Sequence, residues 1–379
     1  MKPRVLHIIT SLSTGGAEHM LARLVQGLNR EFDQQVISLT SLGPVAALLN
    51  RDGVETTSLN LATGFPNPLA IFRLATMIRA FRPDVVQTWM YHADLLGGLA
   101  ARLAGFKSIV WNIRNNDLAR DTTKTRTRWV IKACARLSRR VPRRIVSCAH
   151  SAAQTHIELG YAADKFVVIP NGFDLQRFHP DASARSSVRS ELGLAADTPL
   201  VGLIARFDPQ KNHEGFIRAA HLVHVRKPDV HFLLAGRGVD ANNTVLRRWI
   251  AEAGLDQVTH LLGERADIPR LNQAIDIAVS SSSYGEAFPN ALGEAMACGI
   301  PVVSTDAGDA AQIIGGTGCV LARGDMAGLA NTCLAMLEMD EGERKKLGMS
   351  ARRRIAEYFE MGGVVKQYTR MYGSLLISN

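Results

Sequence analysis

Two patterns of apolar residues alternate along the chain. Short runs rich in β-branched residues predict buried strands, and longer segments with apolar residues three and four positions apart, such as 20–28, predict amphipathic helices. A regular alternation of the two predicts βαβ units, and therefore parallel sheets with helices on both faces. In the first half of the chain the strand-like runs are Val5–Ile9, Gln35–Leu39, Asp84–Gln87, Ser108–Trp111, Arg144–Ser147 and Phe166–Ile169.

The alternation stops at the turn-forming stretch Pro170–Asp174 and the polar residues 181–198, and then starts again. We therefore predict an α/β fold of two doubly wound domains, 1–175 and 176–357, with the expected ligand site in the cleft between them. A last helix, about 358–379, is expected to return to the first domain. The second set of strand-like runs is Leu200–Ala205, Val230–Ala235, Thr259–Leu262, Ile275–Ser280 and Pro301–Ser304.

Composition excludes several classes of protein. With 379 residues, 46% apolar and 21% charged, the chain has enough apolar side chain to fold, so global disorder is excluded. The five cysteines are odd in number and form no C-x-x-C pair, which argues for a reducing compartment and against a structural zinc site. No long stretch is both apolar and free of charge, so we expect a cytoplasmic protein without a transmembrane helix.

The net charge of +9 is unevenly distributed. Residues 1–170 contain 22 basic and 11 acidic residues, whereas residues 171–379 contain 22 and 24, so the excess lies in the first domain. Much of it falls in the segment Lys124–Arg144, where basic residues are interleaved with apolar ones. A basic helix of this kind suits an anionic membrane surface. A solvated helix face with its apolar stripe in the core also fits, whereas no motif supports a nucleic-acid partner. The interleaved apolar residues are Trp129, Val130, Ile131, Cys134 and Leu137.

Two loops have features of an anion-binding site. The loop after the first strand contains Gly15 and Gly16 where a helix should begin, so a ligand can approach main-chain N–H groups closely. The loop after Leu200–Ala205 carries Arg206 and, five residues later, Lys211, two cations that suit a pyrophosphate. Each pattern alone also fits an ordinary turn or an exposed loop.

The segment 280–299 has the most specific pattern. A predicted strand leads into a loop with Glu286, and Pro289 is expected in the first turn of the following helix, with Glu294 about one turn further on. Two carboxylates beside an anion site are costly unless they bind hydrogen-bond donors, and sugar hydroxyls are such donors. Main-chain amides at this helix start belong to Phe288, Asn290 and Ala291.

The block Y-G-E-A-F-P-N-A-L-G-E-A-M-A-C-G, which holds Glu286 and Glu294, resembles the E-x7-E signature of retaining glycosyltransferases of family GT4. The glycine loop, the Arg206 and Lys211 pair and the turn at Pro170–Asp174 fit the same family in order and spacing, so the resemblance spans essentially the whole chain. It implies the GT-B fold, in which two Rossmann-like domains face each other across a cleft and C-terminal helices pack back toward the N-terminal domain. It also implies a nucleotide-sugar donor and no metal or other cofactor, and the sequence contains no D-x-D motif.

The resemblance implies a role for each matching residue. Glu286 would hold hydroxyls of the donor sugar and Glu294 the ribose, while Arg206 and Lys211 would neutralise the diphosphate leaving group. Front-face attack, with the departing phosphate taking the proton of the acceptor, would retain the anomeric configuration. Further donor contacts would come from Gly15, Gly16, Arg265, Ile268, Ala287, Phe288, Asn290 and Ala291.

The acceptor side departs from the family pattern. Gln87 and Trp89 stand where many relatives carry histidines, and His92 is what remains of that pattern. His92 either donates a hydrogen bond to the donor sugar or acceptor, as a catalytic group, or is a structural histidine at a helix start. Asn112 and Arg114 follow the next predicted strand and are expected to bind the acceptor, with Arg114 suited to a phosphate; a solvated arginine is the alternative.

Three functions are compatible with these residues. The favoured one is a glycosyltransferase that acts on a lipid-linked precursor of lipopolysaccharide, capsule or exopolysaccharide at the inner face of the cytoplasmic membrane. The others are a GT-B enzyme with a soluble acceptor, of nucleotide-sugar epimerase or sucrose-synthase type, and a non-catalytic binding protein. The complete nucleotide-sugar set and the basic first domain favour the first function. We expect a UDP-sugar, although no side chain in the sequence distinguishes UDP, GDP and ADP.

Overall fold

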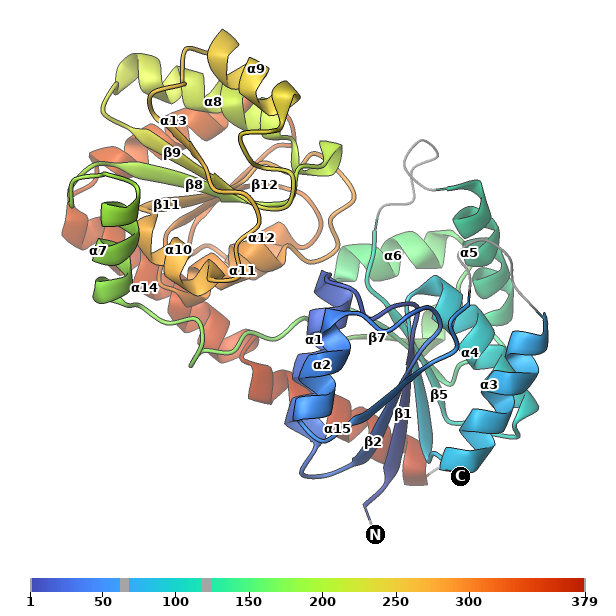
Figure 1. Ribbon diagram of the computed structural model, residues 1–379. Coiled ribbons are helices and arrows are strands. Elements are labelled where there is room, and N and C mark those ends of the chain that lie inside the picture. The colour runs from blue at the N-terminus through green and yellow to red at the C-terminus, as the bar shows by residue number, and fades with distance from the viewer. Residues whose placement is uncertain (1, 62–67, 117–123, 378–379) are drawn as a thin grey trace. The chain divides into compact units, whose positions relative to one another are not determined.

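The computed structural model describes residues 2–61, 68–116 and 124–377 (Figure 1). The chain divides into two compact units, which are treated separately below. Unit 1 comprises Met1–Gly172 and Met361–Asn379, and unit 2 comprises Phe173–Glu360. The division thus lies at residues 172 and 360, a few residues from the boundaries 175 and 357 set by the sequence pattern.

Unit 1 contains, within the described residues, a seven-stranded sheet in the order β3-β2-β1-β4-β5-β6-β7. All its strand pairs are parallel. The strands are β1 (Arg4–Ile9), β2 (Asp33–Ser38), β3 (Glu55–Ser58), β4 (Val85–Trp89), β5 (Ile109–Ile113), β6 (Arg144–Ser147) and β7 (Phe166–Val168).

Helices cover both faces of this sheet. Val5, Ile9 and Trp89 point into a core shared with α1, α2 and α15, whereas Leu6 and Ile8 point into a second core shared with α3, α4 and α5 (Figure 1). This alternation along β1 is the period of two that a strand buried on both faces produces. The helices are α1 (Gly16–Leu28), α2 (Pro44–Arg51), α3 (Pro68–Phe81), α4 (Tyr91–Leu103), α5 (Thr125–Leu137), α6 (His150–Glu158), the 3₁₀ helix η1 (Ala163–Lys165) and α15 (Met361–Ile377).

Unit 2 contains a six-stranded sheet in the order β10-β9-β8-β11-β12-β13, again with all described pairs parallel. Its strands are β8 (Leu200–Ile204), β9 (His231–Ala235), β10 (Thr259–Leu261), β11 (Ile277–Ser280), β12 (Val302–Thr305) and β13 (Cys319–Leu321).

The helices of unit 2 also lie on both faces of their sheet. α8, α9 and α13 share a core with the inward residues of β8 and β9, while α10 packs on α7 and α11 packs on α14 (Figure 1). They are α7 (Ala182–Glu191), the 3₁₀ helix η2 (Pro209–Lys211), α8 (His213–Arg226), α9 (Thr244–Glu252), α10 (Ile268–Ala274), α11 (Asn290–Ala297), α12 (Ala310–Ile314), α13 (Met326–Glu338) and α14 (Glu341–Tyr358).

The prediction of two doubly wound domains is confirmed, and so is the return of the last helix, because Tyr368 and Tyr372 of α15 are fully buried in the core of unit 1. The sequence pattern missed one strand at an edge of each sheet. The missed strand of unit 1, β3, reads Glu-Thr-Thr-Ser and is half exposed, and that of unit 2, β13, has three residues. A short edge strand buries little, so it needs no apolar run.

The strand order reverses between β1 and β4 in unit 1 and between β8 and β11 in unit 2. The loops that leave the carboxyl ends of these strands diverge at this point, which is where doubly wound sheets bind ligands. The sequence places the predicted glycine loop and His92 at the first reversal. It places Arg206, Lys211 and Glu286 at the second.

Candidate functional site

The loop after β8 folds back on itself and so fixes the position of Lys211. The side chain of Asp208 accepts a hydrogen bond of 3.0 Å from the main-chain N–H of Gln210 and caps the 3₁₀ helix η2. Asn212 then adopts a left-handed backbone conformation (φ +52°), and its side chain accepts a 3.1 Å bond from the N–H of Gly215 at the start of α8. Asparagine tolerates this conformation better than most residues, and it is a favoured N-cap.

Glu286 and Lys211 form an ion pair at the reversal point of unit 2. The carboxylate of Glu286 is nearly buried, with 6% of the residue exposed, and its Oε1 also accepts a 2.8 Å hydrogen bond from the hydroxyl of Ser282. Removal of charge from water is costly without a partner, so the pair stabilises each ion in place. Two residues predicted from different loops therefore meet in the structure.

Serines after β11 tie these two loops together. Ser281 donates through its hydroxyl to the carbonyl of Lys211 at 2.8 Å, and the main-chain N–H of Ser283 donates to the carbonyl of Gln210 at 2.9 Å. The carbonyl of Ser282 in turn accepts a 2.6 Å bond from the hydroxyl of Thr305, the last residue of β12. The ion pair thus sits in a framework of main-chain contacts, and sequence reasoning gave these serines no role.

Arg206 lies on the same loop as Lys211 but has other partners. Its guanidinium donates to Asp208 at 3.1 Å and to the side chain of Gln210 at 3.2 Å, and nearly half of its side chain is exposed. The two contacts orient the guanidinium while leaving part of it open to solvent. Such an arginine remains available to an anionic ligand.

The helix after the Glu286 loop begins at Asn290, and Pro289 is its N-cap. The expectation that Pro289 occupies the first helical turn is therefore wrong by one position. Ala291 lies in the first turn and Glu294 in the fifth position of α11. The first turn of a helix carries N–H groups that the helix itself does not satisfy, so the anion-binding character of this segment is retained.

The segment around Ala287 and Phe288 packs closely on its neighbours. Gly308 has φ +62°, and a Cβ there would lie 2.5 Å from the carbonyl oxygen of Ala287. The N–H of Asp309 donates to that same carbonyl at 3.0 Å. The ring of Phe288 packs on Phe173, with a centroid distance of 6.1 Å. The backbone next to Glu286 is thus held by packing and by a main-chain hydrogen bond.

Arg265 and Ile268 lie at the start of α10. The Arg265 guanidinium bonds Glu191 at 2.7 Å and Asp267 at 2.8 Å, and Arg270 binds the same two carboxylates. These bonds raise the pKa of Arg265 and lower the pKa of Asp267. The Arg265 side chain is therefore engaged in joining α7 to α10, and the predicted donor contact of this segment stays a prediction.

In unit 1 an acidic side chain in the first turn of α1, to which the sequence pattern assigned no role, lies against the glycine loop. Glu18 is buried, and a Cβ on Gly15 would lie 2.4 Å from its Oε2. Its Oε1 accepts hydrogen bonds from Ser11 at 3.2 Å and Ser13 at 3.5 Å. Gly15 is the N-cap of α1 and the exposed Gly16 is its first residue. A side chain at position 15 would therefore require the carboxylate of Glu18 to shift.

The turn between β4 and α4 is strained. Met90 has φ +70° and ψ 157°, a region that is nearly restricted to glycine. His92 is the second residue of α4, and partial burial lowers its pKa, so the imidazole is neutral at pH 7. Asp94, two residues after His92, is fully buried, and desolvation raises its pKa to about 8. The hydroxyl of Thr88 donates to Asp94 at 2.5 Å.

Asn112 and Arg114 are both engaged by α15. Asn112 is fully buried, and its Nδ2 donates to the Tyr368 hydroxyl at 3.2 Å, while Arg114 donates to the same hydroxyl at 2.8 Å and also to Asn171. The guanidinium of Arg114 stacks over the ring of Trp89 at 4.7 Å. The structure thus gives both residues a packing role that the sequence did not reveal, and their contact with an acceptor stays a prediction.

Gln87 and Trp89 are also buried. Trp89 donates through its indole N–H to His7 at 3.3 Å, and Gln87 accepts a hydrogen bond from the hydroxyl of Tyr372. Burial lowers the pKa of His7 to about 4, so it is a neutral acceptor. The polar groups of these side chains therefore form hydrogen bonds inside unit 1.

Only the first part of the basic segment Lys124–Arg144 forms the amphipathic helix expected from its sequence. α5 ends at Leu137, and Arg144 begins β6. Ile131 and Cys134 are buried in the core of unit 1, whereas Trp129 is 66% exposed, with the Lys132 ammonium 5.5 Å from its ring centroid. Most of the apolar stripe therefore faces the protein, as in the solvated-face alternative.

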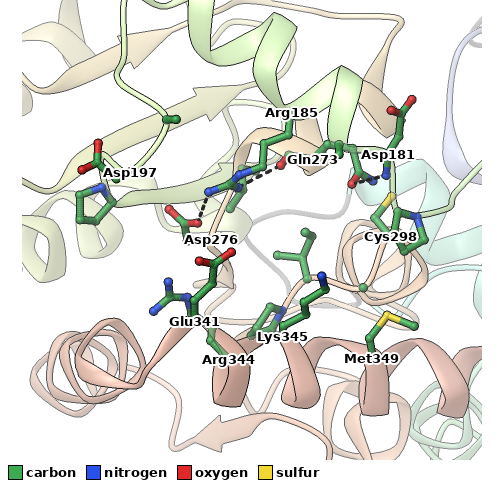
Figure 2. Close-up of a pocket in the computed structure, with 18 of the residues that line it drawn as sticks. Asp181, Arg185, Asp197, Gln273, Asp276, Cys298, Glu341, Arg344, Lys345 and Met349 are labelled. Carbon is green, nitrogen blue, oxygen red and sulfur yellow. Dashed lines mark hydrogen bonds and ion pairs between the residues drawn. The ribbon is translucent and has the colours of Figure 1, made fainter.

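A cavity of about 640 Å³ lies elsewhere in unit 2 (Figure 2). Residues that precede β8, β11 and β12 line it, together with Arg344, Lys345 and Met349 of α14, so it lies at the amino ends of the strands. Arg185 bonds Asp276 on its wall at 2.7 Å. None of the residues predicted to bind the donor lines this cavity. It is therefore separate from the ion pair of Lys211 and Glu286.

Among the described residues, no three His, Cys, Asp or Glu side chains are grouped so that they could hold a metal ion. No helix in the described ranges has the length and apolar character that spanning a bilayer requires.

Two family models of glycosyltransferases match successive parts of the chain. The family model described as "Glycosyltransferase Family 4" matches residues 14–177, and the one described as "Glycosyl transferases group 1" matches residues 198–339. An Escherichia coli UDP-Gal:alpha-D-GlcNAc-diphosphoundecaprenol alpha-1,3-galactosyltransferase is 27% identical over 289 residues, which cover 73% of this chain and 72% of that protein. A Campylobacter jejuni N,N'-diacetylbacillosaminyl-diphospho-undecaprenol alpha-1,3-N-acetylgalactosaminyltransferase is 26% identical over 322 residues, 82% and 83% of the two chains.

Solved structures show the same fold. Anabaena HepE, in complex with UDP and glucose, superposes with a TM-score of 0.86 at 24% identity over 98% of this chain and 100% of that one. The sucrose-phosphate synthase of Thermosynechococcus elongatus superposes with a TM-score of 0.80 at 19% identity over all of both chains. Both structures resemble this chain in the arrangement of their strands and helices.

Proposed function

Because the chain is a glycosyltransferase of family GT4 with the GT-B fold, we propose that it moves a sugar from a UDP-sugar to a lipid-linked glycan acceptor, with retention of configuration and without a metal ion. The observation that carries this proposal is the ion pair of Lys211 and Glu286 where the strand order of unit 2 reverses. That place combines a cation for phosphate with a carboxylate for hydroxyls.

The residues of unit 2 can each take a part in breaking the donor bond. As the bond between the sugar C1 and the phosphate oxygen breaks, negative charge develops on the diphosphate, and Arg206 and Lys211 stabilise it. Glu286 accepts hydrogen bonds from sugar hydroxyls, and Glu294 holds the ribose. The main-chain N–H groups at the start of α11 bind sugar and phosphate oxygens.

The second half of the reaction forms the new glycosidic bond on the same face of the sugar. The acceptor hydroxyl attacks C1, and its proton passes to the departing phosphate oxygen, so no enzymic base is needed. His92, which is neutral at pH 7, lies at the corresponding edge of unit 1 and can donate one hydrogen bond to the reacting groups. In this proposal Gly15 and Gly16 let a ligand approach the start of α1.

The printed names of relatives support the choice of substrates. The Escherichia coli relative is named for UDP-Gal, and both curated relatives are named for acceptors on diphosphoundecaprenol. HepE was solved with UDP and with UDP-glucose. The basic excess in residues 1–170 also favours an acceptor at an anionic membrane. We therefore place the enzyme peripherally on the inner face of the cytoplasmic membrane.

Donor binding is the first test. Thermal shift and saturation-transfer NMR are recorded with UDP-, GDP- and ADP-sugars on the wild type, on Lys211→Met and on Lys227→Met, whose exposed ion pair with Asp229 provides the matched control. We expect UDP-sugars to bind the wild type and the control but not Lys211→Met. Equal binding by all three proteins, or binding of GDP-sugars alone, contradicts the proposed donor site.

Transfer itself is tested with undecaprenyl-diphosphate-linked acceptors and with soluble sugar phosphates. We expect product only with the lipid-linked acceptor, and we expect no loss of rate in EDTA. The anomeric proton of the transferred sugar is expected to show the same configuration in the product as in the donor. Product with the soluble acceptor alone supports the sucrose-synthase type of reaction instead. Inversion of the anomeric centre, or dependence on a divalent cation, refutes the proposed mechanism.

A further inference from the structure

Two aromatic side chains of unit 1 stand out by their exposure. Phe72 of α3 is 61% exposed and Trp129 of α5 is 66% exposed, and the neighbouring Leu69 is also exposed. Leu69 is 70% exposed, and the remaining large exposed side chains among the described residues of Met1–Gly172 are aliphatic and less exposed: Leu42, Leu48, Leu103 and Leu159. An exposed aromatic ring leaves a large apolar area in water, and such rings are enriched at protein and membrane interfaces.

The two rings occupy equivalent places in the fold. α3 and α5 both pack against α4, so the three helices lie in a row on one face of the sheet (Figure 1). In a parallel sheet the connecting helices begin at the carboxyl ends of the strands. Phe72 and Trp129 are each the fifth residue of their helix, and α4 begins between these helices with His92 as its second residue. Both rings are therefore near the edge that carries His92.

The charged side chains of α3 and α5 are all basic. Neither α3 nor α5 contains an acidic residue, whereas Arg73 follows Phe72 directly and Lys132 lies over the ring of Trp129. Basic side chains beside exposed aromatic rings are the combination that binds the interface of an anionic bilayer, where the rings enter the headgroup region and the cations contact lipid phosphates.

We propose that the edge formed by Phe72 and Trp129 docks unit 1 on an anionic lipid bilayer, with His92 facing the membrane-bound acceptor. This inference rests on the proposed function for the acceptor and for the membrane location, and it adds the residues that make the contact. It differs from the sequence-based expectation that the segment Lys124–Arg144 contacts the membrane, because Ile131 and Cys134 belong to the protein core and the proposed contact is made by the N-terminal parts of α3 and α5.

Binding is measured by sedimentation of the full-length protein with vesicles of phosphatidylcholine containing about one third phosphatidylglycerol. Phe72→Ser combined with Trp129→Ser is compared with Val225→Ser, an equally exposed apolar residue of unit 2. We expect the double variant to bind about tenfold more weakly and the control to bind like the wild type. Unchanged binding by the double variant, or preference of the wild type for duplex DNA over the vesicles, overturns the proposal.

Tryptophan fluorescence gives a second readout that locates the contact. Of the four tryptophans, Trp89 and Trp111 are fully buried and Trp249 packs against the core of unit 2, so Trp129 is expected to dominate any change caused by lipid. We expect a blue shift when anionic vesicles are added to the wild type, and its loss in Trp129→Phe, which still binds because an aromatic ring remains. A blue shift that persists in Trp129→Phe contradicts this contact.

Activity separates the two proposals. If the docking edge is correct, the double variant transfers sugar to a detergent-dispersed acceptor at the wild-type rate but loses rate with the same acceptor in vesicles. Equal losses in detergent and in vesicles overturn the docking inference while leaving the transferase proposal intact. No transfer by the wild type in either form, with vesicle binding preserved, refutes the proposed reaction and not the docking edge.

Discussion

Both sheets reverse their strand order next to their first strand, yet the two units use the polar residues near that point differently. In unit 2 Lys211 and Glu286 form an ion pair on loops tied together by serines. In unit 1 Gln87 and Asn112 are turned into the interior, where the tyrosines of α15 bind them. The same backbone plan thus supports a polar site in one unit and a sealed core in the other.

The difference teaches that topology defines a place for a ligand but not its chemistry. α15 belongs to the core of unit 1, and its tyrosine hydroxyls satisfy side chains that would otherwise need a ligand or water. The loops after β8 and β11 in unit 2 satisfy each other and leave Arg206 partly exposed. Substitutions in each unit therefore have different expected effects.

The largest effect is expected from Lys211→Met. It removes the cation beside a nearly buried carboxylate, so we expect a loss of kcat/KM of roughly 10²–10³ and a loss of about 3 kcal/mol in unfolding free energy. Initial transfer rates and urea unfolding measure the two. Lys227→Met, with an exposed partner, is expected to change neither by a measurable amount. A variant that is unstable but fully active would show that the pair is structural.

The next effect is a pH dependence of stability that originates in unit 1. The pKa of Asp94 is raised to about 8 by burial, so the folded state holds a proton that the unfolded state releases near pH 4. The stability due to the neutral carboxyl is complete below that pH and is lost as the pH rises toward 8.

Asp94→Asn removes this dependence, because the amide does not titrate. We expect the unfolding free energy of the wild type to fall relative to that of the variant by up to about 1.4 kcal/mol per pH unit between about pH 5 and pH 8. Denaturation series at several pH values measure the difference, with Asp33→Asn on the exposed end of β2 as the control. Parallel curves for wild type and Asp94→Asn would mean that Asp94 is ionised in the fold.

A smaller effect is expected from Tyr368→Phe, which tests whether α15 seals unit 1. Asn112 and Arg114 both lose an acceptor, so the cost is about 1–3 kcal/mol. Tyr358→Phe, on the exposed surface of α14, is expected to cost less than about 0.5 kcal/mol. If both variants unfold at the same urea concentration, the buried hydroxyl contributes nothing to the stability of unit 1.

The smallest effect concerns the strained turn at Met90. Glycine adopts its backbone angles without strain, so we expect Met90→Gly to be about 1 kcal/mol more stable than Met90→Ala. At an ordinary helix position the order is reversed by a similar amount. Urea unfolding of the two variants decides between them, and transfer rates show whether relief of the strain affects the placement of His92.

Most of the fold was predictable from the sequence because buried strands and amphipathic helices have different periods. The pattern failed where burial is slight, as in the edge strand β3, and where one helix face was ambiguous. In α5 the stripe of Ile131 and Cys134 reads equally well as a core face or a lipid face, and only the contacts with α4 decide that it is core.

The candidate site was predictable where residues lie close together in the sequence or match a family motif. Lys211 and Glu286 are 75 residues apart, but each lies on a loop that follows a predicted strand. The sequence therefore predicted both loops at the carboxyl edge of one sheet. Sequence reasoning missed Glu18, Ser282, Met90 and Asp94, because a buried carboxylate and a strained non-glycine turn leave no periodic signal.

The amino-acid sequence by itself determined the two parallel sheets, the reversal points and the loops that carry Arg206, Lys211 and Glu286, since these follow from short-range patterns. Only the tertiary structure decided which polar residues are used inside the protein. Asn112 bonds a tyrosine 256 residues away, and burial among neighbouring elements raises the pKa of Asp94. Burial and partner choice depend on what packs against a side chain, and that information is spread over the whole chain.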